Sequence, residues 1–365
     1  MSFSGWISRV PRKARGIEPN ARSPVRTSLM AGSGKAHLRP ESDALLRIED
    51  LVVEFRIGRT GLKVNAVSGI SFDVLRGETL GIVGESGCGK STTGRAIMQL
   101  PRATSGSVVF DGRELTTLDK EEMRKVRTKV QMIFQDPISS LNPRRKVRDI
   151  VMEPLKVWNR GSKDEQGDAV DRILEEVGID PSRAAESLPH QFSGGQCQRI
   201  SIARSLMLEP EVIICDEPVS ALDVSVQAQV INLLEDLKRA HRLTLIFIAH
   251  DLAVVKNISD RVAVMYLGKL CEIGPSDDLY AKPAHPYTRL LLDSVPEPDP
   301  GVEPRTSTIG GEPPSPVNPP SGCRFNPRCP SASDRCRTEE PMMREVDSGH
   351  FVACHFPLHG GEAPV

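Results

Sequence analysis

A stretch of nine residues has the composition and spacing of a phosphate-binding loop. It fits the pattern G-x-x-x-x-G-K-[ST] and reads Gly84-Glu85-Ser86-Gly87-Cys88-Gly89-Lys90-Ser91-Thr92. The apolar run 79–83 predicts a buried strand before it, and 92–100 predicts a helix start after it. A chance glycine-rich turn would match the letters, but the flanking strand and helix favour a true P-loop. We expect its N–H groups to bind phosphate, with Lys90 at the β- and γ-phosphates and the Ser91 hydroxyl on Mg²⁺.

Two carboxylates follow a second predicted strand. The run Val212–Cys215 is apolar, as in buried parallel strands, and Asp216 and Glu217 come directly after it. Asp216 is expected to hold Mg²⁺, directly or through water. Glu217 is expected to polarise the water that attacks the γ-phosphate. Such a pair is seldom only structural, so the sequence predicts a site that hydrolyses ATP.

Two further polar residues stand at the ends of predicted strands. Gln135 follows the run 129–134, and His250 and Asp251 follow closely on the run 243–248. The carboxyl ends of strands in such a fold face the nucleotide crevice, so both side chains are expected there. Gln135 is a candidate to reach Mg²⁺ or the attacking water, and a turn-forming role fits equally well. His250 is predicted to sense the γ-phosphate, with packing or capping as the alternative.

A second anion-binding pattern lies more than a hundred residues after the P-loop. Phe192 is followed by Ser193-Gly194-Gly195-Gln196 and a predicted helix over 197–208. The free N–H groups of a helix N-terminus, its positive dipole end and a hydroxyl together suit a phosphate. One chain with one nucleotide has no need of two such sites, but two chains facing head to tail do. We therefore expect this second site to close on the nucleotide of a partner chain.

The overall composition limits the classes of function. The chain has 365 residues, 39% hydrophobic and 26% charged, which is typical of a globular protein of two or three domains. The net charge is −1 and no basic stripe is evident, so we expect no nucleic-acid partner. No apolar run is long enough to span a bilayer. Membrane association is therefore expected to be peripheral and to depend on a partner.

Changes in composition divide the chain. Residues 1–43 mix basic residues with Ser, Pro and Gly without a period and predict a disordered tail. Strand patterns near 51–55 and 64–74 open an α/β body, within which Phe55 is a candidate either to stack on a purine or to pack in the core. This body is predicted to end at residue 295 and to contain a helical subdomain at about 143–208. A linker with nine prolines follows at 296–320. The chain is then predicted to close with a cysteine-rich module at 321–357 and a loose tail at 358–365.

The cysteine-rich module holds Cys323, Cys329, Cys336 and Cys354. An ATP-binding protein works in the cytosol, where thiols stay reduced, so metal ligation is expected rather than disulfides. Four cysteines can hold Zn²⁺ or a [4Fe–4S] cluster. No Cys-x-x-Cys spacing occurs and a proline follows Cys329, which favours the cluster. Unliganded thiols are the alternative, and a zinc site would admit His350 or His355 as substitutes.

Taken together, the motifs resemble those of the ATPases of ABC transporters, over about residues 45–295. The family usually has Leu before Ser-Gly-Gly-Gln, where this chain has Phe192, an exchange of one apolar residue for another. The matching segments are the P-loop, Gln135 in Phe-Gln-Asp-Pro, 193–196, Asp216-Glu217, 220–223 and His250. A narrower likeness, to the ATPase subunits of oligopeptide/dipeptide importers and most of all to the second of their two ATPases, extends to about residue 357 and rests on 135–144, 188–192, 285–289 and the cysteine-rich end.

This resemblance implies a P-loop NTPase fold, with a RecA-like parallel sheet, an antiparallel β subdomain, a helical subdomain and the small cysteine-rich module. It implies ATP and Mg²⁺ as cofactors, a [4Fe–4S] cluster at the cysteines, and a place for Asp223 at the nucleotide. The implied function is to power import of oligopeptides or dipeptides at the cytoplasmic face of the inner membrane. The implied partners are a second ATPase in a heterodimer, two permeases that contact the surface near 135–160 and, indirectly, an extracytoplasmic solute-binding protein.

Other functions remain open on the sequence. The same motor would import nickel, glutathione or another small solute, because the substrate is chosen by the other subunits. A soluble ABC ATPase acting on ribosomes or DNA is a further alternative, although such proteins often carry two P-loops or a long coiled-coil insert. A regulatory, non-hydrolysing partner is disfavoured by the intact Lys90, Asp216, Glu217 and His250.

Overall fold

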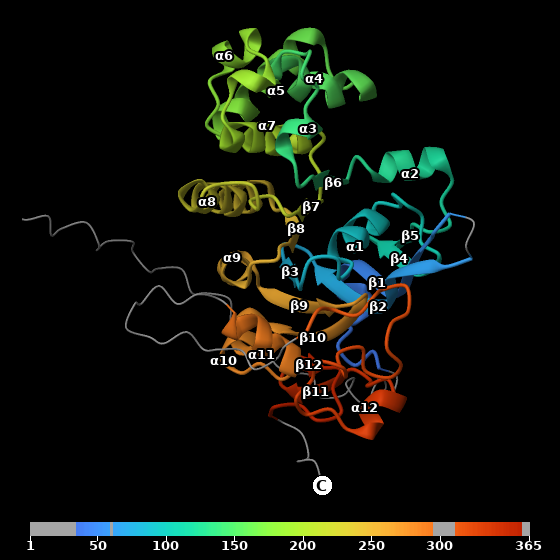
Figure 1. Cartoon of the computed structure of the whole chain (residues 1–365). Helices are drawn as coiled ribbons and strands as arrows, with labels where there is room; N and C mark the ends of the chain where they lie inside the picture. Colours follow the sequence, from blue (N-terminus) through green and yellow to red (C-terminus); the bar gives the residue numbers. More distant parts are fainter. Residues whose placement is uncertain (1–33, 59–60, 295–310, 360–365) are drawn as a thin grey trace, which may run out of the picture.

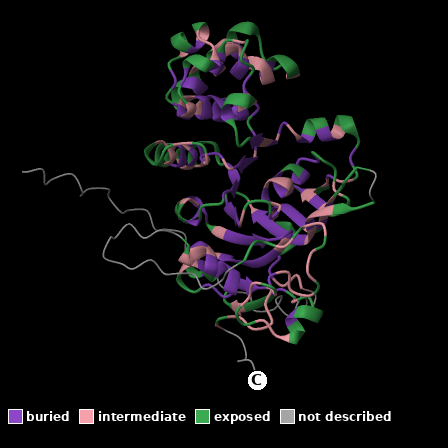
Figure 2. Ribbon diagram, in the orientation of Figure 1, coloured by how far each residue is buried: buried purple, intermediate pink, exposed green. Residues whose placement is uncertain are grey.

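A large mixed sheet runs through the molecule in the computed structural model, which describes residues 34–58, 61–294 and 311–359. Its eight strands have the order β11-β12-β10-β9-β3-β8-β7-β6, and the run from β9 to β6 is parallel. Short apolar strands form this parallel half because both of its faces are buried (Figure 2). The parallel strands are β3 (Thr79–Val83), β6 (Val130–Ile133), β7 (Val212–Asp216), β8 (Thr244–Ile248) and β9 (Arg261–Tyr266).

A smaller antiparallel sheet lies beside the first and has the order β2-β1-β4-β5. Its long strands alternate buried and exposed positions only in part, and several register shifts bend β1 around the core. One hydrophobic core joins this sheet to one face of the main sheet, with α1 among its elements. The elements are β1 (Ala44–Arg56), β2 (Lys63–Leu75), β4 (Ser105–Phe110), β5 (Arg113–Glu114), α1 (Lys90–Ile97) and α2 (Lys120–Val126).

Helices α3 to α7 gather at one end of the molecule, beyond the carboxyl ends of the parallel strands (Figure 1). Their apolar stripes pack together around Val147, Ile150, Val170 and Leu174. Pro154 lies inside α4, which still continues to Trp158. The helices of this end are α3 (Pro137–Ser140), α4 (Val147–Trp158), α5 (Lys163–Glu176), α6 (Pro181–Glu186) and α7 (Gly194–Leu206), while α8 (Val224–His241) and α9 (Leu252–Ile258) pack nearer the sheet.

The C-terminal segment extends the main sheet instead of forming a separate unit. Strand β12 pairs antiparallel with β10, and β11 pairs with β12. Phe325 and Phe351 enter the two hydrophobic cores of the α/β body. The elements are β10 (Lys269–Pro275), α10 (Ser276–Ala281), α11 (Pro286–Asp293), α12 (Asp334–Thr338), β11 (Arg344–Asp347) and β12 (His350–Val352). This segment therefore shares the core of the body, which supplies the apolar surface that its own residues lack.

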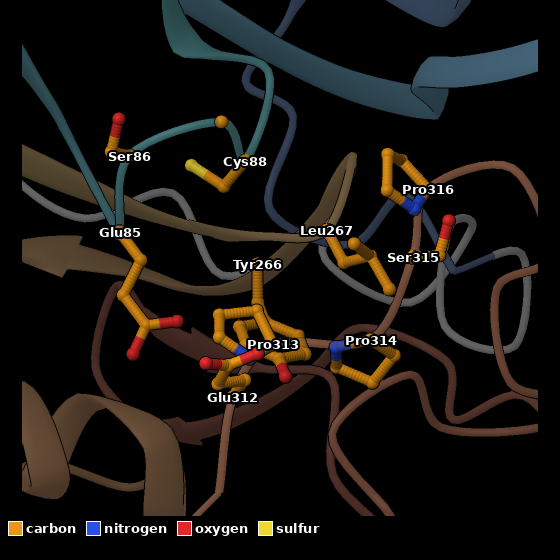
Figure 3. Close-up of a pocket in the computed structure, with 11 residues that line it drawn as sticks. Glu85, Ser86, Cys88, Tyr266, Leu267, Glu312, Pro313, Pro314, Ser315 and Pro316 are labelled. Carbon is orange, nitrogen blue, oxygen red and sulfur yellow. The ribbon is translucent and has the colours of Figure 1, made fainter.

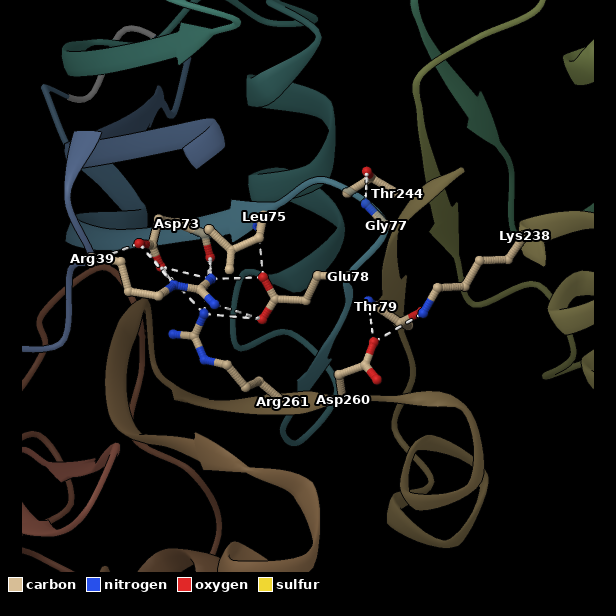
Figure 4. A network of polar contacts seen from close by, with 10 residues as sticks. All are labelled: Arg39, Asp73, Leu75, Gly77, Glu78, Thr79, Lys238, Thr244, Asp260 and Arg261. Atoms are coloured by element: carbon tan, nitrogen blue, oxygen red, sulfur yellow. Dashed lines mark hydrogen bonds and ion pairs between the residues drawn. The ribbon is translucent and has the colours of Figure 1, made fainter. Parts of the chain in front are cut away.

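The predicted disordered tail ends earlier than expected. Residues 34–43 are part of the fold, and the prediction of disorder up to 43 is wrong for them; residues 1–33 lie outside the described ranges. Arg39 donates to Asp73 and Glu78, and Arg261 contacts the same two carboxylates (Figure 4). Asp73 is fully buried, and its hydrogen bonds to Arg39 hold its pKa below the usual range despite desolvation. A buried carboxylate needs such partners, so it orders the tail beside it.

No helix in the described part of the chain is long and apolar enough to cross a membrane.

Candidate functional site

The P-loop connects β3 to α1, and glycine is required at both of its ends. Gly84 has φ +151° and Gly89 has φ +107°. A Cβ on Gly84 would lie 2.1 Å from the carbonyl oxygen of Met265, and one on Gly89 would lie 2.2 Å from that of Ala66. Neighbouring backbone leaves no room for a side chain at either position. The two glycines therefore let the loop close tightly enough to direct its N–H groups at one anion.

The loop lysine is buried and donates to the loop itself. Lys90 Nζ donates to the carbonyl oxygens of Gly84 at 2.7 Å and Glu85 at 3.1 Å. Beside it, Ser91 Oγ donates to Asp216 Oδ1 at 2.6 Å. Asp216 is fully buried; desolvation raises its pKa, and the Ser91 hydrogen bond opposes this effect. The hydroxyl and carboxylate predicted to hold Mg²⁺ thus lie in contact, although the sequence separates them by 125 residues.

Glu217 meets the two polar residues predicted at neighbouring strand ends. Gln135 Nε2 donates to Glu217 Oε2 at 3.1 Å, and His250 Nδ1 lies 3.4 Å from the same oxygen. Glu217 has φ +46°, an unusual value for a residue with a side chain, and its N–H donates to Ile248 O at 3.0 Å. Strain at such a position is typical of functional sites. The arrangement can orient one water between a carboxylate, an amide and an imidazole.

Gln135, Glu217 and His250 line one cleft of about 570 Å³. Phe55 lies in it and is 40% exposed, which leaves its ring accessible to a flat ligand. Pro316 lies in it too, although sequence reasoning assigned that residue only to a linker. Asn65 N and Nδ2 both donate to Pro316 O, which fixes the proline at the cleft. The cleft also contains Ser86, Gly87, Gly89, Lys90, Ser91, Thr92, Gln135, Glu217 and His250.

The second anion-binding pattern does not line this cleft. Ser193 caps α7: its Oγ accepts from Gln196 N at 3.3 Å, and Gln196 Oε1 accepts from Ser193 N at 3.1 Å. Gly195 packs against α8, and a Cβ there would lie 2.4 Å from Val226 Cγ1. Gly194 has room for a Cβ, with Leu222 the nearest contact at 3.5 Å. We call this pattern, Ser193–Gln196, the signature. Within one chain, the signature and the P-loop therefore form separate sites.

Asp223 also lies away from the P-loop cleft. It is exposed at the N-terminus of α8 and its side chain makes no cap hydrogen bond there. Val224 follows it and is 82% exposed.

Two residues close to the P-loop were missed in the sequence. Tyr287 Oη accepts from Glu85 N at 2.8 Å, and the Arg328 guanidinium binds both carboxylate oxygens of Glu85, at 2.9 and 3.0 Å. Tyr287 stands in the segment 285–289 that the sequence marked only as a family likeness. No local pattern identifies Arg328, because the pair is 243 residues apart in the sequence.

The four C-terminal cysteines line one pocket, with His355, Phe325 and Phe356 among the other lining residues. Cys323 N donates to Cys336 O at 2.8 Å, which joins the start of the segment to α12. His350 does not line the pocket; its Nε2 lies 2.6 Å from Glu272 Oε1 in a buried pair. Within the described ranges, no group of three His, Cys, Asp or Glu side chains stands out that could hold a metal ion.

Fold and site together define a P-loop ATPase. Residues 67–220 match the ABC transporter family, and residues 271–336 match the oligopeptide/dipeptide transporter C-terminal region. The fold is similar to the ATP-binding cassette MJ0796 in a dimeric post-hydrolysis state bound to ADP and Pi. The TM-score is 0.58 and the identity 28%, covering 63% of this chain and 98% of that one.

Curated relatives match over nearly their whole length. The oligopeptide transport ATP-binding protein OppF of Escherichia coli is 52% identical over 322 residues, 85% of this chain and 95% of OppF. A putative peptide import ATP-binding protein of Brucella ovis is 50% identical over 310 residues, 85% of this chain and 97% of the relative. The chain belongs to the ATP-binding proteins of ABC transporters, in the oligopeptide/dipeptide group. It is an ATPase of that family, and the resemblance inferred from its motifs is confirmed.

Proposed function

We propose that this ATPase powers the import of oligopeptides or dipeptides through a membrane permease. The observation that carries the proposal is the joining of two parts in one core. A cleft with Lys90, Gln135, Glu217 and His250 belongs to the same body as the segment that matches the oligopeptide/dipeptide C-terminal region. Relatives with about 50% identity over most of the chain carry names of peptide import.

The roles of the cleft residues follow from their contacts. Backbone N–H groups of the P-loop and Lys90 would hold the phosphates. Ser91 and Asp216, with Gln135, would hold Mg²⁺, which supplies charge neutralisation at the β- and γ-phosphates. Glu217 would accept the proton of the attacking water, with Gln135 and His250 positioning it.

Hydrolysis is proposed to need a second ATPase subunit. The Ser193–Gln196 signature lies outside the chain's own cleft, and both it and Asp223 are free to face the nucleotide of a partner. We favour a heterodimer, as in two-ATPase importers. In an assembled pair, Ser193→Ala in this chain should slow hydrolysis of the partner's nucleotide while this chain's own ATP affinity is retained. Full activity of that variant would overturn the composite site.

The permeases are proposed to contact the surface around α3 and α4, on the cytoplasmic face of the inner membrane. Ile138 is 60% exposed and Val157 is 53% exposed on these helices, so apolar side chains are available there. A solute-binding protein outside the membrane would act on this chain only through the permeases.

The cysteine pocket is proposed to hold a [4Fe–4S] cluster. The donor set fits, because four thiols line one pocket. Of the two histidines considered as substitutes, the buried one, His350, is paired with Glu272. The proposal rests on this shared pocket and on the family resemblance, because no group of three His, Cys, Asp or Glu that could hold a metal ion is found among the described residues. Iron and acid-labile sulfide should be present in protein purified without oxygen. If zinc were found in their place, the alternative of a zinc site would be supported. If neither iron nor zinc were found, the four cysteines would be unliganded thiols.

Uptake in cells tests the transported solute. A strain that lacks this chain should lose uptake of a labelled tripeptide, and the wild-type chain should restore it, whereas the Glu217→Gln variant should not. Parallel assays with nickel and with glutathione separate the alternatives. Unchanged tripeptide uptake together with lost nickel or glutathione uptake would assign a different cargo to the same motor.

A further inference from the structure

The P-loop is attached to the cysteine segment by an ion pair. Arg328 NH1 donates to Glu85 Oε2 at 2.9 Å and NH2 donates to Oε1 at 3.0 Å, so the guanidinium binds the carboxylate in the bidentate geometry. The Arg328 side chain is only 9% exposed and that of Glu85 is 26% exposed. Bulk water therefore weakens this pair less than it would a surface pair.

Glu85 connects this ion pair to the phosphate-binding lysine. Its carboxylate points away from Ser86, towards Tyr266 and the linker residues 312–314 (Figure 3). Its carbonyl oxygen accepts from Lys90 Nζ at 3.1 Å, and its N–H donates to Tyr287 Oη at 2.8 Å. The carboxylate, the carbonyl oxygen and the N–H of Glu85 are thus each hydrogen-bonded. Displacement of Glu85 would move one of the two carbonyl oxygens, those of Gly84 and Glu85, that accept from the lysine ammonium.

Arg328 is itself held firmly on the opposite side. Its N–H donates to Phe325 O at 3.0 Å, and the Phe325 ring, 1% exposed, packs edge-on against Tyr266 with centroids 5.2 Å apart. Arg328 NH1 also donates to the Tyr266 hydroxyl at 3.3 Å. Cys329 follows directly in the sequence, and its N–H donates to the same Phe325 carbonyl. The turn that carries Arg328 is therefore the turn that carries one of the four cysteines.

The linker lies beside the same loop. Residues 312–316 line a cavity of about 330 Å³ together with Glu85, Ser86 and Tyr266 (Figure 3). Pro316, the last of these linker residues, also lines the nucleotide cleft and is fixed there by Asn65. The C-terminal extension thus borders both the P-loop and the nucleotide cleft.

We propose that Arg328 is a positioning residue for ATP binding: by holding Glu85 it fixes the P-loop conformation, and so the cysteine segment sets the affinity of the nucleotide site. The proposal rests on the assignment of the P-loop cleft as the ATP site, and not on the cargo or on the occupant of the cysteine pocket. Arg328 touches neither reacting atoms nor phosphate. Its effect passes through Glu85 to Lys90.

The test measures binding of MgATP to the full chain. Arg328→Gln should raise Kd for MgATP about tenfold, which corresponds to about 1.4 kcal/mol. Arg328→Lys keeps the charge but loses the fork geometry, and it should recover part of the affinity. Arg335→Ala is the matched control, because Arg335 lies in the same segment and its ion pair, among the described residues, is with exposed Glu339 at 2.9 Å. That control should bind MgATP like the wild type.

A double-mutant cycle separates positioning from general damage. Glu85→Gln should weaken binding by a similar factor, and combining it with Arg328→Gln should add little, because both changes break one contact. Urea unfolding of each variant reports whether the fold is kept. Wild-type affinity in a folded Arg328→Gln variant would overturn the proposal, and so would fully additive effects. If the wild-type chain itself failed to bind MgATP, the assignment of the ATP site would fail instead.

Discussion

Glu272 is expected to be one of the most sensitive carboxylates for stability. It is fully buried in β10, where its side chain joins three parts of the chain. Oε1 accepts from Ala284 N at 2.8 Å and lies 2.6 Å from His350 Nε2, while Oε2 accepts from His285 N at 2.8 Å. The two backbone donors belong to the turn before α11, and the histidine belongs to β12. One carboxylate therefore anchors both the turn before Tyr287 and the added strand.

The cost of Glu272→Gln follows from counting acceptors. An amide keeps one oxygen and replaces the other by an NH₂ group that cannot accept. With its oxygen at the Oε1 position, the N–H of His285 loses its partner. With the opposite orientation, the N–H of Ala284 loses its partner, and His350 keeps a hydrogen bond only as the tautomer whose Nε2 accepts. One buried unsatisfied donor costs about 1–3 kcal/mol, so the free energy of unfolding should fall by at least that amount. Glu272→Ala removes all three acceptors and should cost about 3–5 kcal/mol.

Urea unfolding followed by far-ultraviolet circular dichroism measures this cost. Glu345→Gln in β11, at the edge of the same sheet, is the control: Glu345 is exposed, and glutamine keeps an oxygen for the N–H of Gly349, so the change should stay within about 0.5 kcal/mol. If Glu272→Gln unfolded at the wild-type urea midpoint with an unchanged slope, the three contacts would contribute no net stability. The reasoning from buried acceptors would then be refuted.

Three further predictions concern the site and its supports. Glu217→Gln should keep ATP affinity and lower turnover at least about a hundredfold in the assembled pair, as measured by phosphate release; wild-type turnover would show that another group is the base. Gly195→Ala should destabilise the chain by about 1–3 kcal/mol because its Cβ meets Val226, whereas Gly194→Ala should unfold like the wild type; equal urea midpoints for both would contradict the packing argument. Burial lowers the pKa of His285 from 6.5 to about 4, so between these pH values only the unfolded chain binds the proton. The contribution of neutral His285 to the free energy of unfolding should be fully present above pH 6.5 and fall by roughly 3 kcal/mol towards pH 4. His285→Asn keeps an acceptor for the helix cap and should remove this pH dependence. If the pH profile of the variant equalled that of the wild type, the assignment to His285 would be wrong.

The parts of the site that lie at strand ends were predictable from the sequence. Apolar runs ending in Asp216-Glu217 and near His250 indicate buried strands, and the carboxyl ends of parallel strands share an edge by geometry. That reasoning predicts that these residues lie together at one edge of the sheet. It did not give the contact of Gln135 with Glu217, nor the left-handed backbone of Glu217, because both depend on how the loops close.

The contacts made by the C-terminal extension were not predictable. Arg328 and Glu272 have no period or motif of their own, and their partners come from distant turns and strands. The tail shows the same limit. Its composition suggests disorder up to residue 43, yet Arg39 is ordered because buried Asp73 requires a cation. Composition indicates whether a segment can fold alone. It does not show that a distant buried charge takes its partner from that segment.

The pairing of β12 with β10 has a consequence for biosynthesis. The edge of the ATPase sheet is covered by His350–Val352, which a ribosome translates long after the P-loop. A nascent chain that has emerged only as far as α11 leaves the outer edge of β10 unpaired and the Glu272 carboxylate without its histidine. The main sheet and the buried contacts of Glu272 therefore cannot be completed until residues 350–352 have been translated.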